Sequence, residues 1–304
     1  MKLLQETRVL PEEIDSLGHM NVRYYMARME KANSEMMAGL GLPYASAFLR
    51  RTDTYTRFMR EQFEGATLQT YGQVLELAEG GMRTHVEVRN EAKEQTAAVF
   101  IVTTSMIDRA SRRVLPMPGD LDVAKSKLPD YAIPRTLSLE TVNSDVTLAQ
   151  LDACIPEIEG GGMMSGKRAT VIEPEDVDSD GWVREDIELM FLPFAKMSAQ
   201  QQVQGPPVFE TQDGRRVGWA VMETRNLRFG QPRLGDEIAY FSADVSLEEK
   251  SRVSRRWAFD RNTSELLGIS DSVGVCIDLV ERRAIPWPDE LRSMIERHLQ
   301  PQLI

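Results

Sequence analysis

The chain repeats itself, and this repeat constrains the fold more than any other feature of the sequence. Shifting the numbering by 163 aligns "PEEIDSLG" (residues 11–18) with "PEDVDSDG" (residues 174–181). Shifting it by 170 aligns "DRASRRVLPMPGDL" (residues 108–121) with "DLVERRAIPWPDEL" (residues 278–291). The two matches occur in the same order and at similar shifts, which predicts two copies of one structural unit with a few residues inserted in the second.

Each copy shows the same order of expected elements. A short β segment comes first, the acidic motif follows, and then come a helix and long strands. Apolar residues recur at three- and four-residue steps over residues 22–40, which is typical of a helix with one buried face. We therefore expect an α+β fold in which each unit packs one long helix against an antiparallel sheet. The expected strands are 6–10, 67–77, 82–90 and 96–108 in the first copy and 168–172, 237–246, 252–260 and 266–280 in the second, whose helix is expected over 187–197.

The length of 304 residues suits two ordinary domains. The repeat predicts an N-terminal domain over residues 1–135 and a C-terminal domain with a degenerate motif over residues 165–304. Residues 136–164 are polar and run into Gly160, Gly161 and Gly162, which indicates a linker with a short helix near residues 148–154.

Composition and charge exclude several classes of function. The net charge of -11 argues against nucleic-acid binding, which needs a basic surface. The sequence contains no run of eighteen apolar residues and no signal-peptide pattern, so a membrane protein is not expected and a cytoplasmic location is the default. The two cysteines give no disulfide framework. The sequence also lacks clustered Cys/His spacing and a glycine-rich nucleotide loop, so we expect no metal and no cofactor.

The segment "DSLGHMNVRYYMARME" carries the functional motif of the first copy. It resembles the hotdog-fold acyl thioesterases of the 4-hydroxybenzoyl-CoA thioesterase type and the related acyl-carrier-protein (acyl-ACP) thioesterases. The matching positions are Asp15, Gly18, His19, Met20, Asn21 and Tyr25. Val22 replaces a usual second Asn, and Leu17 replaces the first Asn of the plant-type acyl-ACP motif. The resemblance implies a double hotdog, with each antiparallel sheet wrapped around one long central helix, and the hydrolysis of an acyl thioester.

The resemblance also implies roles for these residues. Asp15 is the expected nucleophile or general base, and His19 and Asn21 are expected to orient water or the carbonyl group. Backbone N–H groups at the start of a helix can stabilise an oxyanion. Gly18, Met20 and Tyr25 are the expected substrate-binding residues. Each position also has a purely structural explanation, because Asp and Asn cap helices, Gly serves tight turns and Tyr packs in cores.

The second copy keeps Asp178 and Gly181 but has Trp182, Arg184 and Glu188 where the first has His19, Asn21 and Tyr25. We therefore expect one active site, in the first copy. The expected substrate is acyl-CoA, which the Leu17 position favours, with an acyl-ACP thioester as the alternative. A non-hydrolytic acyl-thioester binding or regulatory protein is the second hypothesis. A tandem pair is internally complete, so a homodimer is compatible with the sequence but is not required by it.

Overall fold

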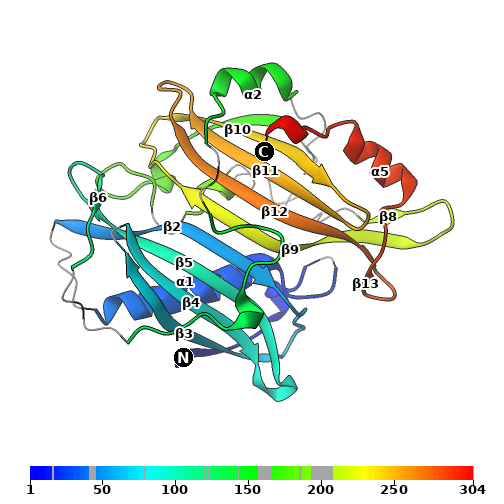
Figure 1. Cartoon of the computed structure of the whole chain (residues 1–304), viewed down its shortest axis with the longest axis horizontal. Coiled ribbons are helices and arrows are strands. Elements are labelled where there is room, and N and C mark those ends of the chain that lie inside the picture. Colours follow the sequence, from blue (N-terminus) through cyan, green and yellow to red (C-terminus); the bar gives the residue numbers. More distant parts are fainter. Residues whose placement is uncertain are drawn as a thin grey trace. The chain divides into compact units, whose positions relative to one another are not determined.

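The computed structural model of the chain describes residues 1–15, 17–40, 46–78, 80–118, 121, 124–140, 142, 144–156, 166–184, 187–192 and 208–303. These residues form two compact units, Met1–Arg135 and Thr136–Ile304 (Figure 1). Both units contain long antiparallel strands. None of the described helices is long and apolar enough to cross a membrane.

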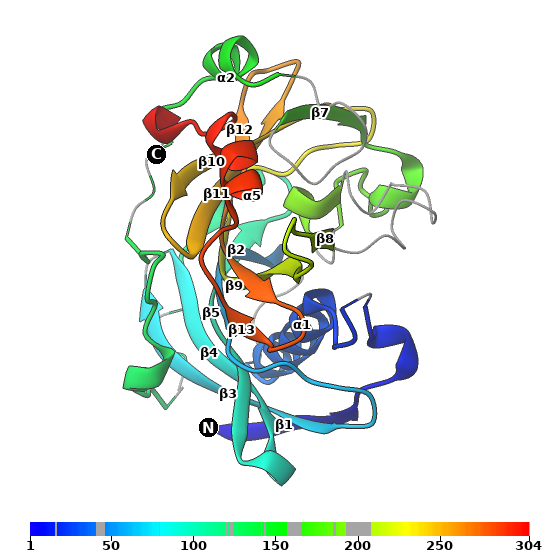
Figure 2. The ribbon, with the colours of Figure 1, turned by 90° about the vertical axis from the view of Figure 1, so that its right-hand side faces the viewer.

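Unit 1 is one helix packed on an antiparallel sheet. Its strands lie in the order β1-β3-β4-β5-β2, and β6 pairs with β5. Helix α1 contacts β1, β3 and β4, and Figure 2 shows it alongside these strands. The elements are β1 (Lys2–Arg8), α1 (Val22–Ala38), β2 (Ala47–Phe58), β3 (Thr67–Ala78), β4 (Gly81–Asn90), β5 (Gln95–Asp108) and β6 (Val114–Leu115). We call the face of the sheet that carries α1 the inner face.

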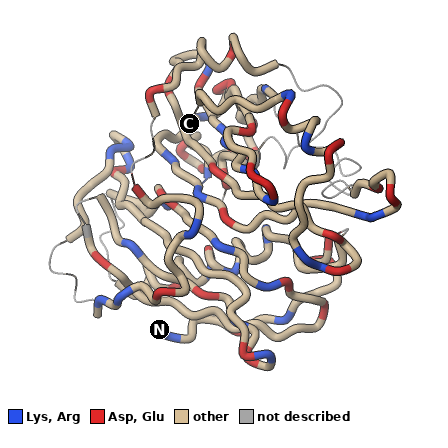
Figure 3. Tube along the Cα trace, turned by 45° about the vertical axis from the view of Figure 1, so that its right-hand side comes forward, with Lys and Arg blue, Asp and Glu red and all other residues tan. Residues whose placement is uncertain are grey.

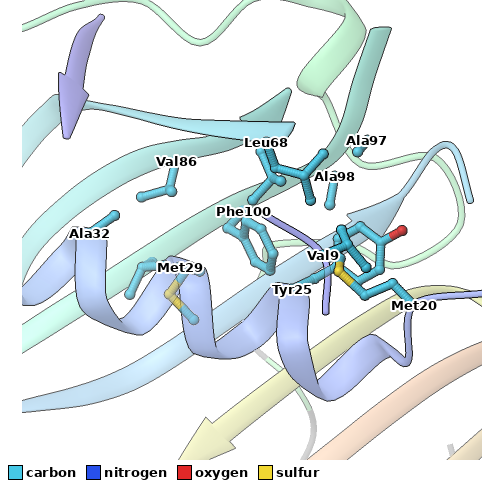
Figure 4. Packing of buried hydrophobic residues seen from close by; sticks show 12 residues of the cluster. Val9, Met20, Tyr25, Met29, Ala32, Leu68, Val86, Ala97, Ala98 and Phe100 are labelled. Atoms are coloured by element: carbon cyan, nitrogen blue, oxygen red, sulfur yellow. The ribbon is translucent and has the colours of Figure 1, made fainter. Parts of the chain in front are cut away.

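The apolar stripe of α1 forms the core of unit 1, as its spacing predicts. Met29 and Ala32 are fully buried and pack with Val86 and Phe100 of the sheet (Figure 4). The stripe also contains one buried amide, Asn33. Its Nδ2 atom donates to Thr104 Oγ1 at 3.0 Å, and its Oδ1 atom accepts from Thr84 Oγ1 at 2.9 Å. These bonds satisfy the buried amide and fix where α1 sits on the sheet.

Unit 2 repeats the strand order of unit 1. Its strands run β7-β10-β11-β12-β9, β13 pairs with β12 and β8 with β9. The elements are α2 (Leu148–Cys154), β7 (Gly166–Val171), β8 (Phe209–Glu210), β9 (Arg216–Arg228), β10 (Glu237–Leu247), β11 (Ser251–Asp260), β12 (Leu266–Asp278), β13 (Arg283–Ala284) and α5 (Asp289–Glu296). Of the helix expected over 187–197, Leu189–Phe191 is a 3-10 helix, and the part from 193 onward lies outside the described residues.

The second sequence match corresponds to a repeated turn. Asp108 accepts the N–H of Arg112 at 2.9 Å, and Asp278 accepts the N–H of Arg282 at 2.9 Å. Both arginines have left-handed backbones, with φ of 58° and 53°. An aspartate carboxylate stabilises each turn, because Oδ1 of Asp108 and of Asp278 accepts a backbone N–H three residues on.

The segment before β7 packs on unit 2. The short helix expected near 148–154 is confirmed as α2, and Leu151 packs against Phe241 and Trp257. Upstream of α2, the Glu223 carboxylate accepts the N–H groups of Thr136 and Leu137, and Arg225 donates to the carbonyls of residues 138–140. Much of the segment that the sequence indicates as a linker is therefore held by buried charged side chains of β9.

Candidate active site

A tight turn fixes Asp15. Its N–H donates to the His19 carbonyl at 2.9 Å, and the Gly18 N–H returns to the Asp15 carbonyl at 3.0 Å. The carboxylate Oδ1 atom accepts the N–H of Leu17 at 2.9 Å. Gly18 has a φ of 79°, which L side chains rarely adopt, and it faces open space. The turn therefore uses glycine for its backbone and aspartate for its hydrogen bond.

The His19 ring lies between two carboxylates. Its Nδ1 atom is 3.6 Å from Asp15 Oδ2, and its Nε2 atom is 3.5 Å from Glu61 Oε1. The side chains of Asp15 and His19 are only 10% and 12% exposed, and that of Glu61 is 34% exposed. A histidine that contacts a carboxylate at each ring nitrogen can take a proton at one and release it at the other. The structure thus brings Asp15 and His19 together and adds Glu61, which the sequence interpretation did not include.

Backbone contacts to residues 60–62 bring Glu61 to the turn. The Met20 N–H donates to the Gln62 carbonyl at 2.7 Å, and the Tyr25 hydroxyl donates to the Arg60 carbonyl at 3.1 Å. One bond comes from the turn and the other from the first helical turn of α1. They hold the chain on both sides of Glu61, so its carboxylate reaches His19.

The structure places Met20 and Tyr25 in the core. They are 1% and 3% exposed, and the Tyr25 ring meets Phe58 edge-on at 5.6 Å. Burial raises the pKa of Tyr25 well above its ordinary value, so this phenol stays protonated and acts as a hydrogen-bond donor. Met20 and Tyr25 are therefore core residues that pack next to the Asp15 turn.

Asn21 is the N-cap of α1. Its Oδ1 atom accepts the N–H of Arg23 at 3.1 Å, and its own N–H donates to the Glu13 carbonyl at 2.9 Å. The amide oxygen of Asn21 therefore caps the helix, and its Nδ2 atom takes no part in this cap. Asn21 follows the turn directly, so the first N–H groups of α1 begin beside Asp15 and His19.

A buried ion pair joins this region to the sheet. Arg28 NH2 lies 2.8 Å from Glu13 Oε2, and its guanidinium also donates to Thr7 Oγ1 and to the Tyr24 and Arg8 carbonyls. The sequence interpretation did not include this pair. An arginine one turn after Tyr25, inside an apolar helix pattern, is the only signal that the sequence offers for it.

Unit 2 has the same turn with different side chains. Asp178 donates to the Trp182 carbonyl at 2.8 Å, and Gly181 donates back to Asp178 at 3.0 Å with a φ of 78°. The carboxylate Oδ1 atom of Asp178 accepts the N–H groups of Asp180 and Trp182. The ring of Trp182, which is partly buried, lies 3.7 Å from the Arg233 guanidinium.

Gln231 occupies the position of Glu61. The 170-residue shift aligns the two, and the backbone agrees, since the Val183 N–H donates to the Pro232 carbonyl as the Met20 N–H donates to that of Gln62. The Gln231 amide donates to the Val183 carbonyl at 2.5 Å. At the positions matched to His19 and Glu61, unit 2 therefore has neither a histidine nor a carboxylate, while the fold of the turn is kept.

A family profile covers this region of the chain. Residues 9–125 match the profile of the thioesterase-like superfamily. This segment is similar to the thioesterase-like superfamily. It contains the turn, α1 and the Glu61 loop. No curated protein sequence matches the chain.

Two solved structures resemble this chain over most of its length. An acyl-ACP thioesterase from Bacteroides thetaiotaomicron aligns with a TM-score of 0.61 at 11% identity, covering 89% of this chain and 96% of that one. A 12:0-ACP thioesterase from Umbellularia californica aligns with a TM-score of 0.62 at 11% identity, covering 88% and 92%. At this identity the likeness shows the hotdog thioesterase fold. Among the described residues, no group of His, Cys, Asp and Glu side chains is arranged to hold a metal ion.

Proposed function

We propose that the chain hydrolyses an acyl thioester at the Asp15 turn of unit 1. The observation that carries this proposal is His19 lying between Asp15 and Glu61, together with the replacement of His19 and Glu61 by Trp182 and Gln231 in unit 2. A turn that needed these groups for folding would keep them in both copies. The second copy folds the same turn without them, which favours a chemical role for them in the first.

The proposed chemistry needs a base or nucleophile, a proton carrier and an oxyanion site. Asp15 either removes a proton from the water that attacks the thioester carbonyl, or attacks the carbonyl itself to form an anhydride, which water then hydrolyses to the free acid and Asp15. The tetrahedral oxyanion then accepts hydrogen bonds from N–H groups at the start of α1. When the C–S bond breaks, the thiolate takes a proton, for which His19 is the carrier between Asp15 and Glu61. Gly18 leaves room for the substrate beside the turn, and Asn21 orients the carbonyl or water through its Nδ2 atom.

We propose acyl-CoA as the substrate, because Leu17 departs from the plant-type acyl-ACP motif. The acyl-ACP thioester is the second candidate, since the two solved structures named above are acyl-ACP thioesterases by title. Parallel assays with one acyl chain on CoA and on a carrier protein separate the two. A higher kcat/KM for the acyl group on the carrier protein would make acyl-ACP the preferred substrate instead of acyl-CoA.

We also propose that the two units are two hotdog domains, over residues 1–135 and 165–304, and that Met20 and Tyr25 shape the substrate site from the core side. The shared strand order and the two repeated turns support this arrangement. A cytoplasmic location and a homodimer belong to the same proposal.

The test compares Asp15→Asn with Asp178→Asn. Asn keeps the turn-stabilising oxygen in both copies, so the melting temperature should change little. We expect Asp15→Asn to lower kcat by about 10²- to 10⁴-fold, the range of a lost catalytic base, and Asp178→Asn to leave turnover within about twofold. Equal losses would mean two working sites. Unchanged turnover in both variants would favour the acyl-binding hypothesis.

A further inference from the structure

Gln62 links the two sides of the contact between His19 and Glu61. It follows Glu61 in the chain, and its carbonyl accepts the N–H of Met20, the residue after His19, at 2.7 Å. A shift of Gln62 would therefore change the position of the Glu61 carboxylate relative to the His19 ring. The contacts that fix the Gln62 side chain thus bear directly on the geometry of the candidate site.

A buried amide pair holds Gln62. Asn90 Nδ2 donates to Gln62 Oε1 at 2.7 Å, and the two residues are only 2% and 1% exposed. Asn90 is the last residue of β4 and precedes a short 3-10 helix, but its side chain makes no capping bond to that helix. Charged side chains are spread along both units (Figure 3), whereas this contact is made by two uncharged amides. Because a buried amide without a partner is costly, the pair ties the Glu61 loop to the end of β4.

Unit 2 has the same backbone arrangement at the matching loop. In each unit, two consecutive N–H groups of the loop donate to one carbonyl of the neighbouring strand, at 2.8–3.1 Å. The two donors and the acceptor are Met59, Arg60 and Ala97 in unit 1 and Phe229, Gly230 and Leu267 in unit 2. Each residue of the second set follows its counterpart by 170 positions. The course of the loop therefore does not depend on the amide pair.

The side chains at the positions of the amide pair differ in unit 2. Pro232 stands at the position of Gln62 and has no side-chain donor or acceptor, and Asp260 stands at that of Asn90. Asp260 is the last residue of β11, and its Oδ1 atom accepts two N–H groups of the turn that follows, at 2.7 and 3.2 Å. The unit without a carboxylate at the position of Glu61 thus also has no amide pair at these two positions.

We propose that Gln62 and Asn90 are positioning residues, whose buried hydrogen bond keeps the Glu61 carboxylate beside His19 Nε2. The inference rests on the proposed function and adds to it the means by which Glu61 is held. Asn90 fixes the Gln62 side chain, and the Gln62 backbone is bound to the turn and continuous with Glu61. Both amides act through Glu61. A misplacement of about 1 Å can lower a rate by about 10²-fold, so the loss of this bond should act on kcat.

The test uses two variants of similar size, Gln62→Met and Asn90→Leu, alone and combined. Each single change leaves one buried amide without its partner, so each should lower the melting temperature and lower kcat by about tenfold or more. In the double variant both amides are gone, so the melting temperature should recover while kcat stays low, because Glu61 is no longer held. A purely structural role would make kcat recover together with stability.

Two further measurements show whether the pair acts through Glu61. In the Glu61→Gln background, Gln62→Met should lower kcat by less than about twofold more, because the effects of coupled residues do not add. The ring-nitrogen NMR resonances of His19, recorded without substrate, should change in the same way in Glu61→Gln and in the double variant. This second measurement does not depend on hydrolysis.

Asp260→Leu is the matched control, since it removes a polar side chain from the same strand end in unit 2. It should lower the melting temperature and leave kcat and the His19 resonances as in wild type. The inference is overturned if the double variant keeps the wild-type His19 resonances, or if its kcat recovers with its stability. An absence of hydrolysis in wild-type protein would instead contradict the proposed function, and the His19 resonances would still decide whether the amide pair positions Glu61.

Discussion

The pair Glu61 and Gln231 differs by one group, a carboxylate against an amide, at matched positions of the two units. Glu61→Gln reproduces in unit 1 what unit 2 already has. Because the amide cannot accept a proton from His19, we expect kcat to fall by about 10²-fold or more, with unchanged stability. Steady-state kinetics and thermal melting measure the two effects, and Gln231→Glu is the matched control, which should leave kcat unaltered. A normal kcat in the Glu61→Gln variant would contradict the proposed role of Glu61 in the mechanism.

Gly18 and Gly181 offer a second matched pair. Both have positive φ and open space where a Cβ would stand, so alanine adds backbone strain and no clash. We expect each alanine variant to lose about 1 kcal/mol of unfolding free energy. Only Gly18→Ala should also reduce turnover, because strain in that turn displaces Asp15 from His19. Chemical denaturation and kinetics on both variants check this, and a loss of turnover in Gly181→Ala would count against a single site.

The local motif predicted part of the candidate site, and the fold supplied the rest. Asp15 and His19 lie in one turn, so five consecutive residues suffice to bring them together. Glu61 lies 42 residues after His19 and reaches it only because Met20 and Tyr25 bind the backbone on either side. No spacing rule encodes such a contact. The sequence contains one signal for the role of Glu61: the repeat aligns it with Gln231, which is not acidic.

Among the elements, β2 and its counterpart β9 in unit 2 are long strands that the sequence interpretation did not include. The segment of β2 shows why. This segment, "AFLRRTDTYTRF", is rich in charge, and the pairing with β5 shifts register between Arg51 and Asp53. That irregularity breaks the alternation by which a strand is recognised. Arg50 and Arg57 are nevertheless buried. By contrast, α1 and strands β3 to β5 follow clear periodicities, and their expected bounds agree with the structure to within about two residues.

Strand β4 carries a buried charged cluster on the face opposite to α1. His85 Nε2 lies 3.2 Å from Glu87 Oε1, and both side chains are fully buried. Arg89 Nε and the Tyr131 hydroxyl also bind the Glu87 carboxylate. Burial lowers the pKa of His85 to about 4, and the Glu87 charge offsets only part of this effect.

This cluster makes stability depend on pH. An unfolded histidine has a pKa near 6.5, so below that pH the unfolded chain takes up a proton that folded His85 refuses until about pH 4. Stability should therefore fall as the pH drops from about 6.5 to 4, by up to about 3 kcal/mol. His85→Gln should flatten this part of the curve, measured by denaturation at a series of pH values. His298→Gln is the control and should leave the slope as it is.

For the whole molecule, the proposed function places one catalytic site, at the Asp15 turn, in each chain of 304 residues. A quenched-flow titration with a slow acyl thioester should therefore release close to one thiol per chain in any initial burst. A labelled substrate analogue measures independently the fraction of active chains, and the burst is divided by this fraction. A burst of two per chain would show that the Trp182 turn also works.

The conserved backbone of the two turns has a consequence for protein engineering. Because unit 2 already folds the aspartate turn with the same hydrogen bonds and nearly the same glycine φ, its scaffold needs no redesign. Trp182→His, Arg184→Asn and Gln231→Glu would restore the side chains of the first copy. A variant with these three changes would therefore test whether the turn of unit 2 can take up the chemistry proposed for unit 1.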